Sequence, residues 1–396
     1  PGFEGHSHVF AGLLRSKGLE VEVLGPPDEE SARLGEEFSS GRECHPYSLL
    51  AGEMVRLVRS GRVRDGDAFM APGTRLPCLL PQYGDGWRMV RDQLGAPLEI
   101  WDPHVAEMKE FLGLHGVGCL YGGLTVVDQL IIAACRRRPW EVVPGSVDLA
   151  IEDCYKDLED TLARRRAKGY EVVEELTECV RRSMARLGRV PLGPESPRPL
   201  VGVTGDLYTR INAIGNGGLF ARLESLGCTV WPSPFFGATA DFEAPQNARR
   251  KAARGEGLDV CKEYALAILQ LGFRESLISA LDEDLRPYCE EPSSAELQSA
   301  AQAFFGADTN HLVRGIVGKM VTFARRGVHG VISAAGLNCM VGVSAAATVP
   351  AIRSANNGIP VVALFYGSHE GPSHRIALET FVHQVHERFH RLSRAD

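Results

Sequence analysis

Residues 200–231 read LVGVTGDLYTRINAIGNGGLFARLESLGCTVW, and this stretch decides the fold class. A short apolar run, Leu200 to Val203, leads through a polar, glycine-rich loop into a helical pattern from Gly218 to Leu226. A second apolar run, Cys228 to Trp231, follows directly. Two strands joined by a helix need a crossover connection, which is typical of a parallel sheet. The sequence therefore predicts an α/β unit at this point.

The same alternation of strand and helix patterns extends outward in both directions. Before it, the periodicity predicts helices over 7–18, 49–58, 82–94 and 124–137, strands over 19–24, 68–71 and 98–101, and one continuous charged helix over 150–188. Residues 193–199 have the composition of a linker. After it, residues 240–325 read as mostly helical, and two further strands, 330–334 and 360–365, flank a helix over 343–354.

This order predicts three parts. Residues 1–145 form a first α/β domain, residues 146–197 a helical segment and linker, and residues 198–396 a second α/β domain. The second domain is interrupted by a helical insert at about 240–325.

The composition excludes several classes of protein. The 396 residues are 44% hydrophobic and 23% charged, as in ordinary globular proteins. A net charge of -7 without a long basic stripe argues against nucleic-acid binding, and no apolar run approaches the roughly 18 residues of a membrane span. Ten scattered cysteines do not resemble a secreted disulfide scaffold, so we expect a cytoplasmic protein. The chain begins at Pro1 without a methionine, and we expect it to be one piece of a longer polypeptide.

Three cysteines share one local setting. Cys44 lies in Gly-Arg-Glu-Cys-His-Pro, Cys78 in Leu-Pro-Cys-Leu-Leu-Pro and Cys339 in Gly-Leu-Asn-Cys-Met-Val-Gly, and each precedes a helical pattern. The positive end of a helix dipole favours thiolate over thiol. Because thiolates bind iron–sulfur clusters and soft metals, the pattern predicts one site assembled from Cys44, Cys78 and Cys339.

Two other interpretations of these cysteines stay open. A structural zinc ion needs four nitrogen or sulfur ligands, usually with two close in sequence, and Cys44-His45 is too tight for such a pair. Three thiolates suit a 4Fe–4S cluster with one open iron. Alternatively, the thiols are buried packing residues, as we expect for most of the other cysteines.

The loop after residues 200–205 carries polar side chains. We expect Asp206, Tyr208, Arg210 and Asn212 to line the cleft or to support the cluster ligands. The alternative is a tight turn followed by a helix cap. Neither a GxGxxG nor a GxxxxGK[ST] motif occurs in the chain.

Taken in order, the motifs resemble a known family. They are Ser40-Gly-Arg-Glu-Cys-His-Pro, Pro77-Cys-Leu-Leu-Pro-Gln-Tyr-Gly, Arg138-Pro-Trp-Glu, Val201-Gly-Val-Thr-Gly-Asp-Leu-Tyr-Thr-Arg-Ile-Asn, Asn338-Cys-Met and Leu378-Glu-Thr-Phe-Val-His-Gln. The chain resembles the 2-hydroxyacyl-CoA dehydratase superfamily, in particular the cluster-binding module associated with CoA-substrate enzyme activases and the double-cubane cluster proteins. It departs from that pattern at Leu79, where the family usually has arginine.

The resemblance implies a fold and a cofactor. The fold would be two flavodoxin-like doubly wound domains, with helical insertions, facing each other across a cleft. Cys44, Cys78 and Cys339 would hold a 4Fe–4S cluster, or an 8Fe–9S double cubane. A double cubane needs six thiolates, so it would require extra ligands or a partner subunit, and Cys119 and Cys154 would be the first cysteines to test.

The resemblance also implies a function and partners. A separate ATP-dependent activator with its own 4Fe–4S cluster would supply low-potential electrons, the cluster would reduce a small substrate or acyl-CoA, and the protein would be a homodimer. Two rival functions remain. One is a non-catalytic electron-relay or docking module of a larger activase-type protein. The other is a metal-free CoA- or nucleotide-binding α/β protein whose cysteines only pack.

Overall fold

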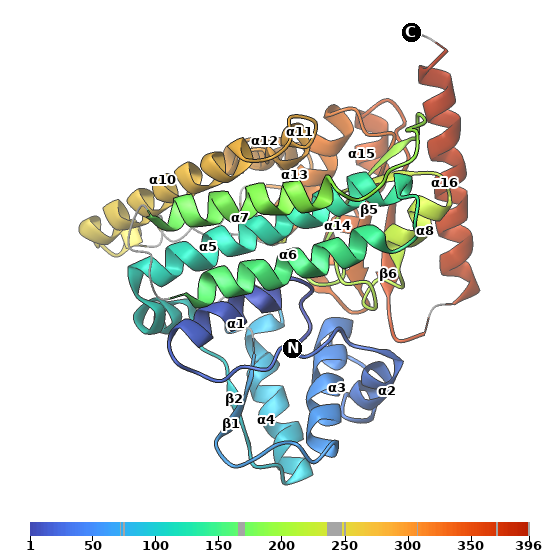
Figure 1. The fold of residues 1–396 in the computed structure, drawn as a ribbon. Coiled ribbons are helices and arrows are strands. Elements are labelled where there is room, and N and C mark those ends of the chain that lie inside the picture. Colours follow the sequence, from blue (N-terminus) through green and yellow to red (C-terminus); the bar gives the residue numbers. More distant parts are fainter. Residues whose placement is uncertain are drawn as a thin grey trace.

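A four-stranded parallel sheet forms the centre of the larger part of the molecule (Figure 1). The computed structural model describes residues 1–71, 73, 76–164, 171–235, 248, 251–306, 308–369 and 371–394. The sheet has the order β4-β3-β5-β6, from β3 (Leu200–Gly205), β4 (Thr229–Pro232), β5 (Gly330–Gly336) and β6 (Val361–Tyr366). Strand order reverses between β3 and β5, because the chain adds β4 on one side of β3 and then β5 and β6 on the other.

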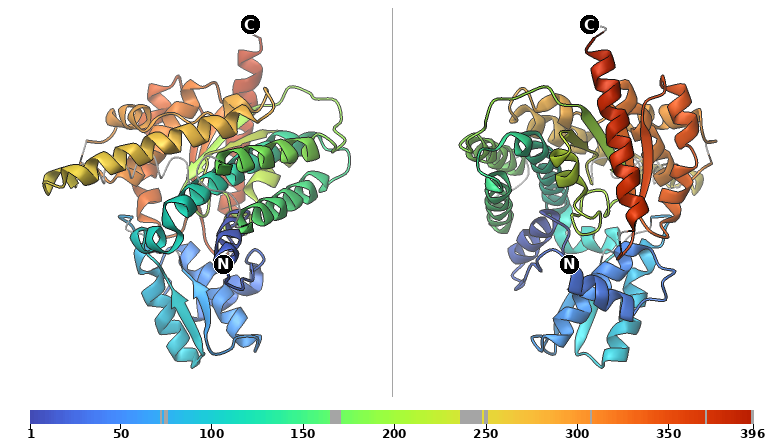
Figure 2. Two further views of the ribbon diagram at one scale, coloured as in Figure 1. Left: turned by 60° about the vertical axis from the view of Figure 1, so that its left-hand side comes forward. Right: turned by 90° about the vertical axis from the view of Figure 1, so that its right-hand side faces the viewer.

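Helices cover both faces of this sheet. On one face lie α13 (His311–Arg325) and α14 (Met340–Ala346), backed by α12 (Ser294–Gln302) and α15 (Val349–Ala355). On the other lie α8 (Leu219–Ser225), α16 (Pro372–Leu392) and the end of α5 (Val105–Arg137), as Figure 2 shows. Both faces are therefore buried, which explains why β3 and β5 read as continuous apolar runs.

A second, smaller sheet lies in a lobe below the first (Figure 1). β1 (Asp67–Met70) pairs in parallel with β2 (Leu98–Trp101), and α4 (Tyr83–Leu94) connects them. Gly95 ends α4 in the left-handed conformation, with φ of 60°. The remaining helices of this lobe are α2 (Glu29–Glu37) and α3 (His45–Arg59), which pack against each other.

A layer of long helices forms the third cluster of buried side chains. It contains α1 (His6–Ser16), α5, α6 (Ser146–Ala163), α7 (Glu171–Leu187) and α10 (Gly257–Ser279). The short helices η1 (Leu80–Gln82), η2 (Arg138–Trp140) and α11 (Arg286–Cys289) complete the described elements. Residues His115–Trp140 are long and apolar enough to cross a membrane by length and composition, but 78% of their most apolar window is buried in the protein, as in a core helix.

The alternation of strands and helices confirms an α/β fold with parallel sheets. Two details of the predicted elements are wrong. Residues 19–24 form no strand, and the carbonyl oxygen of Val21 accepts a hydrogen bond from Nη2 of Arg15 at 2.6 Å. The helix expected over 150–188 ends at Ala163 because Arg164 is extended, and α7 begins at Glu171.

The helical insert at about 240–325 stays a prediction, and its residues 240–247, 249–250 and 307 lie outside the described part. Its last helix, α13, packs directly on β3 and β5. That helix is therefore a crossover helix of the sheet. Helices α10, α11 and α12 lie between β4 and this crossover.

Candidate functional site

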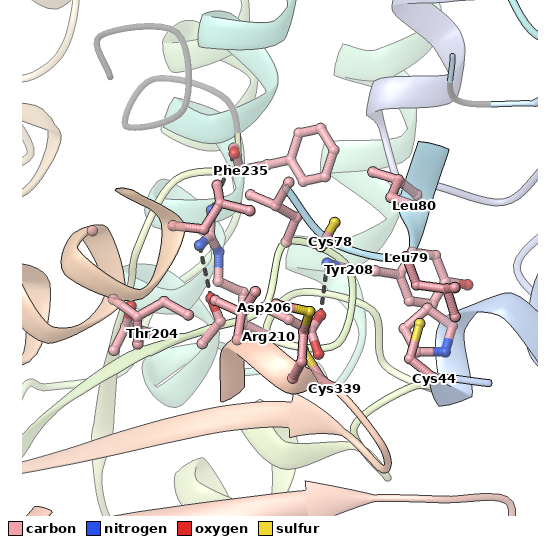
Figure 3. Close-up of a pocket in the computed structure, with 18 of the residues that line it drawn as sticks. Cys44, Cys78, Leu79, Leu80, Thr204, Asp206, Tyr208, Arg210, Phe235 and Cys339 are labelled. Carbon is pink, nitrogen blue, oxygen red and sulfur yellow. Dashed lines mark hydrogen bonds between the residues drawn. The ribbon is translucent and has the colours of Figure 1, made fainter. Parts of the chain in front are cut away.

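A cavity of about 170 Å³ lies at the carboxyl ends of β3 and β5, where the strand order reverses. Ligands of open α/β sheets bind at this position, because loops at neighbouring strand ends diverge there. Cys44, Cys78 and Cys339 all line the cavity, although they come from three separate parts of the chain (Figure 3). The structure therefore brings the three predicted cysteines to one place.

Each cysteine lies at or near the start of a helix. Cys44 is the N-cap residue of α3, and Cys339 is the N-cap residue of α14, where its sulfur accepts the N–H of Gly342 at 3.4 Å. Cys78 lies in the turn just before η1. All three thiols are free and only partly buried.

Backbone contacts fasten the cysteine segments to the larger sheet. His45 N–H donates to the carbonyl oxygen of Leu337 at 3.0 Å, and the Asn338 side chain donates to Gly41 O at 3.0 Å and Glu43 O at 3.2 Å. These bonds join the start of α3 to the loop after β5. The segment of Cys78 is held similarly, because Asn310, the N-cap of α13, donates to Pro77 O at 2.8 Å.

Asp206 shapes the loop after β3. Its Oδ1 accepts the backbone N–H groups of Tyr208 and Thr209 at 3.0 and 2.7 Å, and its Oδ2 accepts that of Gly336 at 2.5 Å. The carboxylate therefore ties the ends of β3 and β5 together beneath the cavity. Removal from water raises the pKa of Asp206, and these N–H groups oppose that rise.

The other three loop residues differ in their relation to the cavity. Tyr208 and Arg210 line it, and Arg210 is only 4% exposed. Asn212 does not line it: this buried side chain accepts the N–H of Gly215 at 2.7 Å and so stabilises the loop. This contact of Asn212 fits the alternative interpretation, in which the loop is a structural turn.

In the metal-free chain, burial opposes the thiolate form that the helix N-termini favour. Helix N-termini favour thiolates, but burial raises the pKa of Cys44 to about 11 and that of Cys339 to about 12. Burial also raises the pKa of Cys78. The nearby charge of Asp206 acts in the same direction on all three. Loss of hydration outweighs the hydrogen bonds that oppose it, so burial favours the neutral form of the metal-free thiols.

Among the described residues, no group of three or more His, Cys, Asp or Glu side chains is arranged to hold a single metal ion. A cubane binds its thiolates at separate corners, so its ligands need not converge on one atom. Three free thiols around one cavity are a donor set that fits such a cluster. A bound metal centre would lower the pKa values of the thiols, since coordination deprotonates a thiol outright.

The extra cysteines considered for a second cubane lie elsewhere. Cys119 lines a different cavity, with its sulfur 3.7 Å from Nε2 of His115. Cys154 is buried in the helical layer, 3.9 Å from Nη1 of Arg186. Neither lines the cavity of Cys44, so a second cubane would need ligands from another chain.

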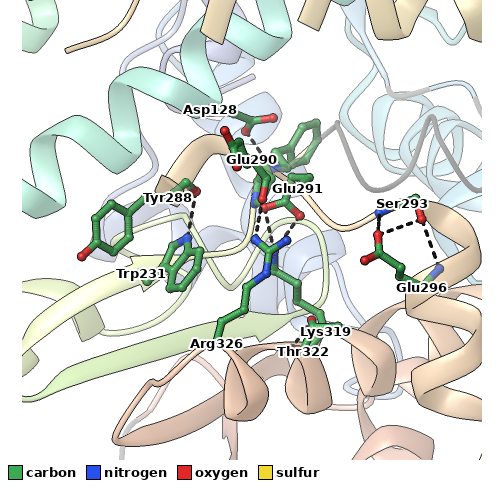
Figure 4. A network of polar contacts seen from close by, with 12 residues as sticks. Asp128, Trp231, Tyr288, Glu290, Glu291, Ser293, Glu296, Lys319, Thr322 and Arg326 are labelled. Atoms are coloured by element: carbon green, nitrogen blue, oxygen red, sulfur yellow. Dashed lines mark hydrogen bonds and ion pairs between the residues drawn. The ribbon is translucent and has the colours of Figure 1, made fainter. Parts of the chain in front are cut away.

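Several lining residues were not predicted from the sequence. Tyr83 contacts the Cys44 sulfur, Phe3 packs its ring on Tyr208 with centroids 5.1 Å apart, and Lys319 reaches the cavity from α13. Lys319 Nζ lies 2.6 Å from both carboxylate oxygens of Glu291 (Figure 4). Local patterns carry no signal for these contacts, although Tyr83 belongs to the Gln-Tyr-Gly part of a motif already noted.

Comparisons of the chain with protein-family models, with curated proteins and with solved structures find no match. What this site does must therefore be inferred from its own residues and from the motifs in the sequence.

Proposed function

We propose that Cys44, Cys78 and Cys339 hold a 4Fe–4S cluster and that the protein uses it to reduce a small substrate or acyl-CoA. The observation that carries this proposal is that these three free thiols line one cavity at the reversal point of the sheet. Such a cluster, when bound, supplies single electrons at low potential. The motif order that resembles 2-hydroxyacyl-CoA dehydratases supports the same conclusion.

The chain's own residues have distinct tasks in this proposal. The three thiolates bind the cluster, leaving one coordination position open toward the cavity. Leu50 and Ile316 contribute buried apolar walls to the cavity. Asp206 fixes the spacing of the two strand ends through its three backbone partners.

The proposal extends to the fold and to the partners. We infer two flavodoxin-like domains across a cleft. The order β4-β3-β5-β6 supports this for the larger sheet. As in flavodoxin-like sheets, the strand that comes first in the chain, β3, lies inside the sheet, and the strand that follows it, β4, lies at the edge. A separate ATP-dependent activator with its own 4Fe–4S cluster supplies the electrons, and the protein acts as a homodimer. The absence of a phosphate-binding motif in this sequence agrees with a separate source of ATP hydrolysis.

Iron and acid-labile sulfide per chain, measured on anaerobically purified protein, test the cluster. We expect about four of each and broad absorption at about 400 nm. Cys44→Ala, Cys78→Ala and Cys339→Ala should each lose most of the iron. Cys261→Ser is the matched control, because this exposed cysteine lies on α10 away from the cavity. Iron-free protein after anaerobic reconstitution, or full iron in all three variants, would overturn the proposal.

A metal-free binding protein is a second candidate, favoured by the raised pKa values of the three thiols. Neutral thiols pack like small apolar side chains. This candidate predicts a colourless protein that binds its ligand without iron. If the protein is instead a non-catalytic electron-relay module, it should have full iron content but show no turnover in the presence of the activator.

A further inference from the structure

Helix α10 has apolar side chains on two opposite faces. One face packs against α5 and α7, where Leu277 is fully buried. A helix turns by about 100° per residue, so Ile268 lies opposite Leu277. That opposite face is exposed, and the left view of Figure 2 shows the N-terminal half of α10 projecting beyond the other helices. Its apolar side chains, three or four residues apart, are called the α10 stripe: Leu258, Cys261, Tyr264, Ile268 and Leu271.

The α10 stripe exposes more apolar surface than single surface residues normally do. Leu258 is 82% exposed, Ile268 68% and Tyr264 55%. A helix that is apolar on opposite faces is typical of one that is covered on both, and a contiguous exposed apolar patch marks an interaction site. The chain before α10 bonds to a different face, because Lys251 pairs with Glu263, which is itself buried. The stripe therefore needs a partner.

The charges around the stripe favour a second copy of the chain as that partner. A two-fold dimer joins the same patch on both copies, so the patch must be complementary to itself. The chain has a net charge of -7, and most other contacts between two copies would oppose like charges. Between Lys262 and Arg274 the sequence has one charged residue, Glu263, which Lys251 neutralises on the other face. The stripe can thus meet a copy of itself without repulsion.

An antiparallel pairing fits the order of residues along the stripe. A crossing centred between Tyr264 and Ile268 sets Tyr264 against the partner's Ile268. It also sets Cys261 against the partner's Leu271, so a small side chain meets a large one. Opposed helix dipoles favour the same direction, because unlike ends meet. The pair would bury on the order of 1,000 Å², about the smallest area of a specific interface.

We propose that two copies of the chain dimerise through an antiparallel pair of α10 helices whose stripes face each other. The homodimer is part of the proposed function, and the inference rests on it only to that extent. The interface itself depends on α10 alone. Among the described residues, none of α10 lines the cavity of the three cysteines, so the dimer leaves that cavity accessible.

Sedimentation of the anaerobically purified chain tests the interface. The wild-type protein should have twice the chain mass at micromolar concentration. Ile268→Glu should raise the dimer dissociation constant at least about tenfold, because its carboxylate would be buried among apolar side chains. Met89→Glu is the matched control, since Met89 on α4 is 66% exposed and lies outside the stripe. A monomeric wild-type protein, or Ile268→Glu that dimerises as well as Met89→Glu, would overturn the proposal.

Disulfide cross-linking tests the direction of the helices. In the antiparallel pair, Leu271→Cys should link to the partner's Cys261 when diamide oxidises the two thiols. The wild-type protein should not form this link, because Cys261 lies roughly 15 Å along the helix from the partner's Cys261. Peptide mapping identifies the linked residues. A link between two copies of Cys261 would show parallel helices and overturn the proposal. If Ile268→Glu does not fold, the wild-type mass and this link still decide.

Iron content, measured on the same fractions, distinguishes the two proposals. Iron in a monomeric protein removes the interface and the homodimer but leaves the cluster. A dimer with the expected link but without iron removes the cluster and leaves the interface.

Discussion

The sulfur of Cys44 lies 2.7 Å from the phenolic oxygen of Tyr83, a side chain that is itself buried. Burial raises the pKa of the Cys44 thiol to about 11, and the hydrogen bond with Tyr83 opposes that rise. The contact joins α3 to α4, so the two helices that flank the smaller sheet meet at the predicted cluster ligand. Removal of the phenolic oxygen of Tyr83 should therefore change the reactivity of the Cys44 thiol.

Tyr83→Phe should slow the alkylation of Cys44 in the metal-free chain severalfold, because loss of the hydroxyl raises the thiol pKa further. Mass spectrometry after timed exposure to iodoacetamide gives the rate at this residue. Tyr47→Phe is the matched control, since the Tyr47 ring packs on Tyr83 with centroids 5.3 Å apart but its hydroxyl has no bond to Cys44. An unchanged or faster rate in Tyr83→Phe would contradict this reading of the contact.

Gly336→Ala should destabilise the protein and reduce its iron content. A Cβ atom at Gly336 would lie 2.6 Å from Cδ of Pro46, so β5 and the start of α3 would be forced apart. Overpacking of this kind costs about 1–3 kcal/mol. Thermal unfolding and iron analysis measure the two effects.

Gly272→Ala is the control for that substitution. It lies within α10, where an added Cβ meets nothing within 4 Å. It should stabilise the protein by about 0.5–1 kcal/mol and leave the iron content unchanged. Equal behaviour of the two alanine variants would show that the approach of Gly336 to Pro46 is unimportant.

Lys319→Met should cost about 3–5 kcal/mol, because Glu291 would be left as a buried charge without its partner. The two side chains are 3% and 4% exposed. The double variant Lys319→Met with Glu291→Leu should recover much of that loss, since both charges are then gone. Urea unfolding of the four proteins in this cycle gives the coupling energy. A double variant that loses the sum of the two single losses would contradict the pairing.

His329 should make the protein less stable in weak acid. Its ring Nδ1 accepts the backbone N–H of Leu200 at 3.0 Å. The backbone N–H of His329 donates to Leu200 O at 2.8 Å and so extends the pairing of β3 with β5. Burial and the charge of Arg388 lower the pKa of His329. The unfolded imidazole therefore takes up a proton near pH 6.5 while the folded one does not, so this contribution to stability is present above that pH and is lost below it.

Urea midpoints between pH 7.5 and 5 measure this dependence. His329→Gln should flatten the slope in that interval. The exposed His383→Gln variant should keep the wild-type slope. A wild-type midpoint that rises as the pH falls through this interval would contradict the prediction for His329.

Local signals in the sequence predicted most elements of the fold. The helix ending at Gly95 and the apolar runs of β3 and β5 were predicted because they depend on nearby residues alone. The strand predicted over residues 19–24 is absent, because an alternating pattern makes a strand only where another strand lies beside it. The packing of α13 on β3 and β5 did not follow from its sequence, because a helical pattern does not show which sheet lies beneath it.

The site was predicted in part for a similar reason. The carboxyl ends of parallel strands share one edge of a sheet, so the convergence of Cys339 with the loop at Asp206 followed from topology. The raised pKa values of the thiols did not follow, because burial depends on packing from the whole chain. The contacts of Tyr83, Phe3 and Lys319 likewise join residues that only the folded chain brings together.

The hydrogen bonds from Asn338 to the segment before Cys44 span most of the polypeptide. During translation the ribosome must therefore add residues 45–339 before these three thiols can meet. At about 5–20 residues per second, about 15–60 s pass between the synthesis of Cys44 and that of Cys339. Throughout that interval the nascent chain presents its thiols to its surroundings, so the proposed cluster would need a reducing environment and delivery of iron after synthesis.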